Sequence, residues 1–276
     1  KKYKINISNN ELKVIGDLIN PTKQYEDKYN NWDKKFQVGK WIFQIVSNPK
    51  NSIDVDKFDY INRDNKAIGL KLDVDFSRLI LQAKVIDDDI YYPIQTKEII
   101  YQLFFVRYQL HRRIYHHKTV KAIEILIVDI LDELEKSHKI SRYLMDMNKM
   151  NLLVDSFIFH TNNEQVNLLI NKIETRNLPS LVKEEINLKP YHFDDKILSQ
   201  FNEEDYVKIK YKIGYSNDKC NPLSNVSFYQ PKDMETFDDV SIQNFSLLTN
   251  ESHQEYVFRI YCKNLDKRKE LYQKLN

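Results

Sequence analysis

The spacing of apolar residues along the first 150 positions or so predicts a series of helices. Apolar side chains recur every three or four positions over residues 9–19, 54–68 and 96–136. Gly69 is placed to end the second of these segments, and the third contains neither proline nor glycine, so we expect one long helix there. Shorter helices are predicted over residues 39–46, 148–159, 164–175 and 266–275.

After about residue 180 the helical spacing gives way to alternation of apolar and polar residues. Residues 206–215, 226–230 and 255–261 alternate in this way, as half-buried strands do. Residues 231–252 are polar and acidic and predict a long loop. Nearer the start of the chain, β-branched and aromatic residues around three aspartates indicate a small hairpin over residues 79–92.

These patterns predict a mainly α protein with a smaller α+β lobe at its C-terminal end. We place the helical body at residues 1–178 and the α+β lobe at residues 179–276. We see no internal repeat that would indicate a solenoid or a propeller.

Composition excludes several functional classes. Only 4 of the 276 residues are glycine, and no two lie close enough for the phosphate-binding loops of Rossmann or P-loop proteins. The 42 basic and 40 acidic residues give a net charge of +2, so non-specific nucleic-acid or membrane binding is not expected. Apolar stretches are too short to span a membrane. Two cysteines suit a reducing compartment, the cytoplasm or the nucleus.

Two helices each carry a stripe of ionisable and aromatic residues. Positions i, i+4 and i+8 of a helix fall within an arc of about 80°. The residues with this spacing are Asp56, Tyr60 and Asp64, with Lys57 beside them, and Arg107, His111 and Tyr115 on the long predicted helix. Charges buried there must pair with each other or with a ligand. The stripes therefore predict either a structural salt-bridge network or a pocket for an anionic ligand.

A second basic set lies on another face of the same predicted helix. Arg113 and His117 are rotated well away from Arg107, which favours a solvated or interface face over a second anion site. The adjacent rings of His116 and His117 face different directions and cannot share one metal ion. The sequence has no H-E-x-x-H pattern, which argues against a zinc hydrolase.

Two stretches resemble the SAM- and HD-domain-containing deoxynucleoside triphosphate (dNTP) triphosphohydrolases. The first is residues 45–60, reading I-V-S-N-P-K-N-S-I-D-V-D-K-F-D-Y, with Arg63 and Asp64 after it. The second is residues 110–115, reading L-H-R-R-I-Y, with His117 and Lys118 after it. Weaker similarity continues through residues 173–178, 221–229 and 258–263. The resemblance implies an HD-domain-like helical body.

The resemblance also implies a role for each residue of the two stripes. Such enzymes bind a metal ion, here Mg, Mn, Fe or Zn, and hydrolyse dNTPs to deoxynucleoside and triphosphate. The resemblance makes Asp56 the final metal ligand and Lys57, Arg107 and His111 contacts of the triphosphate. The resemblance also implies that Tyr60 and Asp64 contact the deoxyribose and that Tyr115 packs where a 2′-hydroxyl would clash. His116, at a position where the family usually has glutamine, is a further substrate contact.

Family members also form oligomers that a nucleotide, GTP or a dNTP, activates. The positions that match their regulatory contacts are Arg78, Arg113, His117, Lys118, Arg176 and Lys263. They imply a homo-oligomer and a second nucleotide site. Pro93 and Gln95 stand where the family has basic residues, which is a departure from the regulatory pattern.

The largest departure concerns the other metal ligands. No histidine is followed by aspartate, and none precedes Asp56, so the family's His and His-Asp ligands are missing. We expect this chain to be the C-terminal part of a longer enzyme and to be inactive alone. The alternative is a non-catalytic nucleotide-binding or oligomerisation module that has lost its metal site. A weaker third hypothesis is binding of single-stranded nucleic acid through the basic face.

Overall fold

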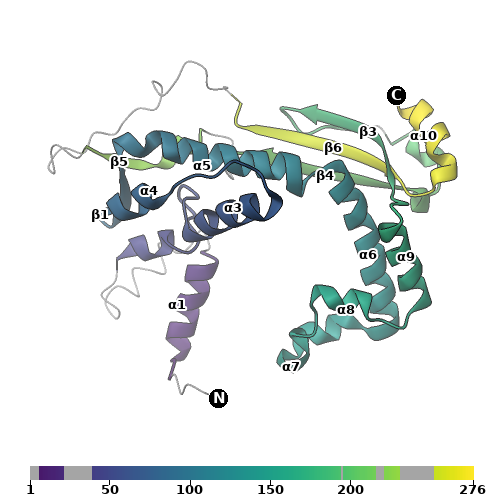
Figure 1. Ribbon diagram of the computed structural model, residues 1–276, viewed down its shortest axis with the longest axis horizontal. Coiled ribbons are helices and arrows are strands. Elements are labelled where there is room, and N and C mark those ends of the chain that lie inside the picture. Colours follow the sequence, from purple (N-terminus) through teal and green to yellow (C-terminus); the bar gives the residue numbers. More distant parts are fainter. Residues whose placement is uncertain (1–5, 22–38, 194, 216–220, 231–251) are drawn as a thin grey trace. The chain divides into compact units, whose positions relative to one another are not determined.

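The computed structural model describes residues 6–21, 39–193, 195–215, 221–230 and 252–276 (Figure 1). Its contacts divide the chain into two units. The first unit is Lys1–Leu110 with Gly214–Gln254, and the second is His111–Ile213 with Glu255–Asn276. This division does not follow the boundary at residues 178/179, which stays a prediction.

The first unit is built on two packed helices and a small sheet. Helices α3 (Val55–Ile68) and α5 (Lys97–Leu110) pack against each other. They are accompanied by α1 (Asn9–Ile19), α4 (Ser77–Gln82) and short 3₁₀ turns at Lys40–Gln44, Ile94–Thr96 and Pro222–Asn225. The fully buried side chains include Ile61 of α3, Leu79 of α4, and Leu103 and Phe104 of α5. Burial of this apolar surface is the main contribution to the unit's stability.

The sheet of the first unit contains the predicted hairpin. Strands β1 (Lys84–Ile86) and β2 (Asp89–Pro93) are antiparallel, and β5 (Ser227–Tyr229) pairs with β2 in parallel. Asp87 and Asp88 both have positive φ, 47° and 65°. A two-residue turn of this kind matches the twist of the flanking strands, and aspartate tolerates it. The hairpin is therefore confirmed, although residues 77–82 form helix α4 instead of its first strand.

A polar cluster ties Asp89 of this hairpin to two other segments. The Asp89 carboxylate accepts hydrogen bonds from Gln44 Nε2 at 2.6 Å and Ser227 Oγ at 2.9 Å, and it pairs with Lys50. Burial alone would raise the pKa of the Asp89 carboxyl. The hydrogen bonds from these three side chains outweigh burial and hold that pKa below its usual value.

We predict that Asp89 makes the chain sensitive to acid. A carboxyl whose pKa is lowered by folding stabilises the chain fully above its unfolded pKa of about 4, and this contribution is lost as the pH falls through the folded pKa. Asp89→Asn should therefore flatten the acid side of the stability profile, as measured by urea unfolding between about pH 3 and pH 7. Asp88→Asn, at the neighbouring exposed position in the turn before β2, is the matched control. Parallel profiles for Asp89→Asn and the unmodified chain would contradict the prediction.

Helix α3 begins and ends as its sequence predicts. Asp54 is the N-cap, and its carboxylate accepts a hydrogen bond from the backbone N–H of Lys57. Gly69 follows the last turn with φ of 72°, in the left-handed region where a residue with a Cβ is strained. Local chemistry therefore specifies both ends of the helix that carries the first stripe.

We expect Gly69→Ala to destabilise the protein by about 1 kcal/mol, because alanine must adopt the same positive φ. Gly16 is the matched control. It lies in helix α1, and an added Cβ there meets no atom within 4 Å. Gly16→Ala should stabilise by roughly 0.5 kcal/mol, since alanine is the better helix former. The midpoints of urea unfolding measure both changes, and equal effects at the two glycines would count against this account.

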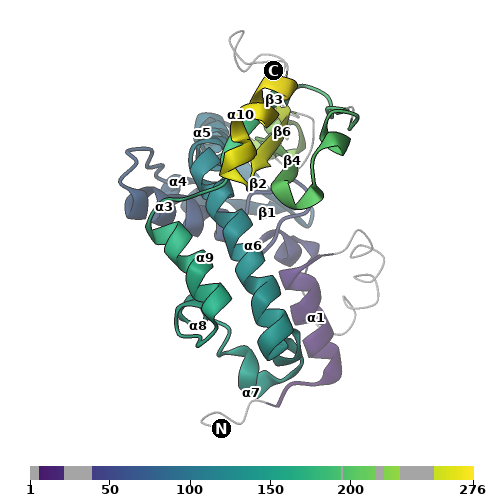
Figure 2. The same ribbon diagram turned by 90° about the vertical axis from the view of Figure 1, so that its right-hand side faces the viewer.

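The second unit combines a helical pair with a three-stranded sheet. Helices α6 (Lys118–His138) and α9 (Glu164–Glu174) lie side by side (Figure 2) and bury Ile130, Leu134, Val166 and Ile170. The sheet has the order β3-β6-β4, from β3 (Ser180–Asn187), β6 (Gln254–Cys262) and β4 (Tyr206–Gly214). β3 and β6 are antiparallel. Helix α10 (Arg268–Leu275) packs on this sheet through Leu271 and Leu275.

Shorter helical segments complete the second unit. They are α7 (Met147–Met150), α8 (Asp155–Phe159) and 3₁₀ turns at Ile140–Met145, Leu198–Gln200, Glu203–Asp205 and Leu265–Lys267. The mainly α fold class with smaller α+β elements is confirmed. Among the helices that the structure describes, none has both the length and the apolar character to cross a bilayer.

The prediction of one helix over residues 96–136 is wrong. Helix α5 ends at Leu110, His111–Tyr115 form a π-helical turn, and α6 begins at Lys118. The His116 N–H donates to the His111 carbonyl at 2.9 Å, a five-residue hydrogen bond. His117 then leaves the helical conformation and caps α6, its ring accepting from the Thr119 N–H. Apolar spacing continues through this break and conceals it.

Two of the predicted short helices also need correction, one strand was not predicted, and the predicted loop lies mostly outside the described residues. The helix over residues 148–159 is wrong because α7 and α8 are separate, and residues 39–46 contain only a 3₁₀ turn. Strand β3 is absent from the predictions. Residues 231–251 of the predicted loop, and Cys220, lie outside the described residues, whereas Cys262 is buried.

Candidate functional site

A buried polar loop precedes helix α3 and sets the position of its first turn. The Asn48 side chain donates to Asn51 Oδ1 at 2.7 Å and to the Ile53 carbonyl at 3.1 Å. The Asn48 backbone N–H donates to Asp54 Oδ2 at 3.1 Å. Sequence reasoning missed these supporting residues, although asparagine and aspartate at this spacing are the residues that form side-chain-closed turns. The loop fixes Asp54 and, through it, the start of α3.

Asp54 also fixes the side chain of Lys57. Its Oδ2 atom lies 3.0 Å from Lys57 Nζ, and the two side chains are only 5% and 14% exposed. The ammonium group therefore lies at the N-terminal turn of α3, where the helix dipole is also positive. Lys57 is held in one position close to the positive end of the helix, which suits binding of an anion.

Tyr60 joins α3 to α5 through Arg107. The Arg107 guanidinium lies close enough to the Tyr60 hydroxyl to act on its pKa, and its NH1 group donates to the Gly214 carbonyl at 2.7 Å. Burial raises the pKa of Tyr60, and the nearby Arg107 only partly offsets this effect. Tyr60 is therefore a neutral phenol at pH 7. The structure brings Lys57, Tyr60 and Arg107 to the packed face of α3 and α5.

The two remaining residues of the first stripe lie in more open positions. Asp56 is exposed in the first turn of α3, and Asp64 is half-buried two turns later with Arg63 Nε at 3.4 Å. In the part of the chain that the structure describes, no group of three or more His, Cys, Asp or Glu side chains could hold a metal ion. The described residues therefore do not by themselves fit the metal that the resemblance implies.

The other predicted substrate contacts belong to the second unit. His111 meets Tyr115 edge to face, with ring centroids 5.0 Å apart, and stacks on His116 at 5.6 Å. Burial lowers the pKa of His116, so this ring is neutral at pH 7. Because a π-helical turn begins at His111, the α-helical spacing that related Tyr115 to Arg107 does not hold.

Two of the predicted regulatory residues line one pocket of the second unit. Lys118 and Arg176 lie on a pocket of about 420 Å³, together with Arg268. Sequence reasoning missed Arg268, which sits at the start of α10 without a distinguishing motif. Three cations in one pocket attract an anion.

The remaining regulatory candidates are placed separately. Lys263 lines an adjoining pocket of about 350 Å³, and its ammonium lies 2.7 Å from the Asp129 carboxylate. Arg113 and His117 are exposed in the turn before α6. Arg78 is exposed on α4 in the first unit, where it donates to Gln82.

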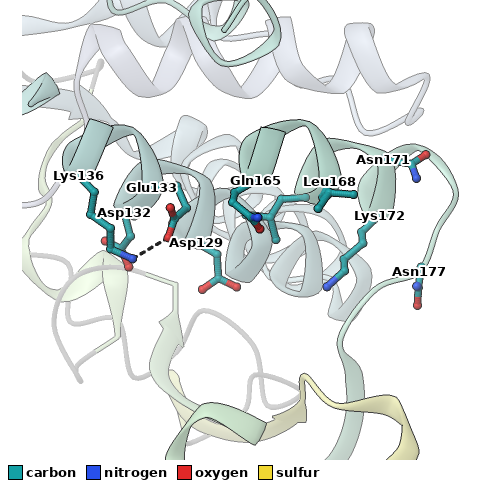
Figure 3. A pocket seen from close by; sticks show the side chains of 10 residues that line it. Asp129, Asp132, Glu133, Lys136, Gln165, Leu168, Asn171, Lys172 and Asn177 are labelled. Carbon is teal, nitrogen blue, oxygen red and sulfur yellow. Dashed lines mark hydrogen bonds and ion pairs between the residues drawn. The ribbon is translucent and has the colours of Figure 1, made fainter. Parts of the chain in front are cut away.

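A larger pocket, of about 530 Å³, lies between α6 and α9 (Figure 3). Acidic side chains of α6, namely Asp129, Asp132 and Glu133, face Gln165, Leu168 and Lys172 of α9 across it. Lys136 neutralises Glu133 at 2.6 Å. None of the predicted site residues lines this pocket.

Comparison with known proteins gives matches over most of the chain. It is 31% identical to a deoxynucleoside triphosphate triphosphohydrolase SAMHD1 homolog of Dictyostelium discoideum, over 93% of this chain and 51% of the relative. It is 29% identical to human SAMHD1, over 94% and 47%. An HD domain-containing protein of Acanthamoeba polyphaga mimivirus is 28% identical over 94% and 60%. No protein-family model matches the chain.

The chain spans about half the length of the curated relatives it matches. The matches cover more than nine tenths of the chain, whereas the resemblance is based on residues 45–60 and 110–115. They confirm the resemblance: over most of its length this chain is similar to SAMHD1 dNTP triphosphohydrolases and to an HD domain-containing protein.

Proposed function

We propose that the chain is part of a dNTP triphosphohydrolase, an enzyme that releases deoxynucleoside and inorganic triphosphate. The observation that carries this proposal is the arrangement of Lys57 and Arg107, two cations that buried partners hold on α3 and α5 of one unit. The similarity to SAMHD1 proteins supports the same substrate class.

Lys57 and Arg107 would neutralise the phosphates of the bound nucleotide. A triphosphate carries several negative charges. Additional charge develops on its oxygens as a water oxygen bonds to the α-phosphorus, the bond from that phosphorus to the sugar oxygen breaks, and the sugar oxygen takes up a proton. Cations already fixed by Asp54 and by the Gly214 carbonyl need little reorganisation to stabilise that charge. The guanidinium also has the fork of donors that suits phosphate oxygens.

Tyr60 and Asp64 would hold the deoxyribose. A neutral phenol can both donate and accept a hydrogen bond, and a half-buried carboxylate can accept one from a sugar hydroxyl. In the second unit we assign His111 to the phosphates, and Tyr115 and His116 to the sugar side of the nucleotide. Tyr115 would exclude a 2′-hydroxyl and so select deoxynucleotides.

By the resemblance we propose Asp56 as a metal ligand, and its carboxylate is exposed in the first turn of α3. The described residues do not supply a complete ligand set with it. We therefore propose Asp56 as one metal ligand only, and none of the steps above involves the metal.

The regulatory residues are also proposals. We propose that the pocket lined by Lys118, Arg176 and Arg268 binds an activating nucleotide, GTP or a dNTP, in a homo-oligomer. Lys263 would bind a phosphate of this nucleotide after its ammonium leaves the Asp129 carboxylate. We propose a cytoplasmic or nuclear location for the protein.

The test is product analysis with the protein expressed from its complete reading frame. Each dNTP, incubated with Mg²⁺ or Mn²⁺, should give deoxynucleoside and triphosphate in equal amounts. Asp56→Ala and Lys57→Ala should abolish the products, whereas Lys66→Gln at an exposed position in the last turn of α3 should not. Nucleotide binding without any product would instead favour the non-catalytic nucleotide-binding or oligomerisation module. If the protein neither binds nucleotide nor forms products, both hypotheses are overturned.

A further inference from the structure

The π-helical turn that carries His111, Tyr115 and His116 is closed by two contacts to the carbonyl of His111. Both the backbone N–H and the Nδ1 atom of His116 contact the His111 carbonyl oxygen, at 2.9 and 3.0 Å. Because a carbonyl only accepts, Nδ1 of His116 must carry the proton. The π-helical turn therefore sets the tautomer of one ring and the separation of the His111 and His116 rings.

Arg259 holds the same turn from the sheet. This side chain is only 9% exposed and lies on β6, directly opposite Glu184 of β3. Its Nε atom donates to Glu184 at 2.5 Å, and NH1 donates to the His116 carbonyl at 2.6 Å. A buried guanidinium with both contacts satisfied is costly to move. The end of the π-helical turn is thus anchored to two strands.

Tyr211 of β4 holds the His116 ring itself. The two rings stack with centroids 4.3 Å apart and planes inclined by 25°. Arg259 lies over the Tyr211 ring at 5.5 Å. Within the described part of the chain, the buried Tyr211 hydroxyl has no hydrogen-bond partner. The tyrosine therefore acts here through its ring, and its hydroxyl contributes no contact of its own.

We infer that Tyr211 and Arg259 are positioning residues for nucleotide selection, which they control by fixing His116 and thereby the rings of His111 and Tyr115. The inference rests on the proposed function, because it requires that this turn contacts the sugar side of the nucleotide. It adds two residues from β4 and β6 that do not touch the substrate. Their removal should change discrimination between dATP and ATP more than it changes binding of the phosphates.

The experiment compares Tyr211→Phe with Tyr211→Leu in the complete protein. Tyr211→Phe keeps the stacked ring and removes only the unpartnered hydroxyl, so dATP and ATP affinities should match the unmodified protein. Tyr211→Leu removes the stack, which is worth up to about tenfold in affinity. We expect it to weaken dATP binding by about tenfold and to reduce the preference for dATP over ATP. Inorganic triphosphate, which Lys57 and Arg107 bind together with His111, should lose less affinity than dATP does.

A second measurement follows His116 directly. Nitrogen chemical shifts of its ring should show the Nδ1–H tautomer in the unmodified protein and in Tyr211→Phe, and a mixture of tautomers in Tyr211→Leu and Arg259→Met. If Tyr211→Leu changes neither the preference for dATP over ATP nor the His116 tautomer, the inference is overturned and the proposed function is not. An unmodified protein that binds neither dATP nor triphosphate would instead overturn the proposed function.

Discussion

Arg107→Gln should weaken binding of inorganic triphosphate by about 100-fold, because hydrogen bonds from a charged donor are worth about 1.5–3 kcal/mol each. Glutamine keeps one N–H donor for the Gly214 carbonyl but removes the charge. Isothermal calorimetry with sodium triphosphate on the complete protein measures the effect. Arg107→Lys should recover only part of it, since one ammonium cannot reach Tyr60, Gly214 and a phosphate together.

Arg63→Gln is the matched control for that experiment. Arg63 lies on α3, as Lys57 and Tyr60 do, but its side chain is 62% exposed and pairs with Asp59 and Asp64, neither of which is assigned to the phosphates. Its loss should change triphosphate affinity less than about twofold, because exposed pairs contribute little and are screened by salt. Similar losses for Arg63→Gln and Arg107→Gln would mean that general positive charge, and not the position of Arg107, attracts the anion.

The part of the fold that could be predicted is the part with local signals. Helix α3 has Asp54 before its first turn and Gly69 after its last, and both residues act as the sequence indicates. The hairpin of β1 and β2 likewise follows from Asp87 and Asp88, which accept positive φ. In each case the residues that specify the element lie inside it or next to it.

Strand β3 and the π-helical turn could not be predicted for a different reason. In β3 the pairing register shifts between Leu181 and Lys183, so the alternation of apolar and polar residues is interrupted. At His111–Tyr115 the extra residue of the turn leaves the apolar spacing of α5 and α6 nearly continuous. Contacts with the sheet, such as the bond from Arg259 to His116, hold this turn, and they join residues 143 positions apart.

The candidate site shows the same division between local and distant information. Spacing on α3 groups Asp56, Tyr60 and Asp64, but it does not show that Arg107 of α5 reaches Tyr60. That contact depends on how α3 and α5 pack, which apolar residues such as Ile61 and Phe104 decide. The choice between a salt-bridge network and an anion pocket likewise depends on distances. Lys57 does form a buried ion pair, with Asp54, and this pair fixes the cation that we assign to the phosphates.

Asp54→Ala should destabilise the first unit by about 3 kcal/mol. The carboxylate is 5% exposed and serves three groups, the N–H of Asn48, the N–H of Lys57 and the Lys57 ammonium. Alanine leaves all three without their acceptor, and an unpaired buried charge is the most costly of these losses. Urea unfolding measures the change.

Asp59→Ala is the comparison that isolates burial, because Asp59 also pairs with a cation of α3 but is 64% exposed. It should cost less than about 0.5 kcal/mol. Asp54→Asn, whose amide oxygen can still accept from a backbone N–H, should fall between the two alanine variants. The double variant Asp54→Ala with Lys57→Ala should lose less stability than the sum of the single variants, since the buried ammonium is then absent. Equal costs for Asp54→Ala and Asp59→Ala would show that the loop before α3 does not depend on this carboxylate, and Lys57 would then lack the fixed position that phosphate binding requires.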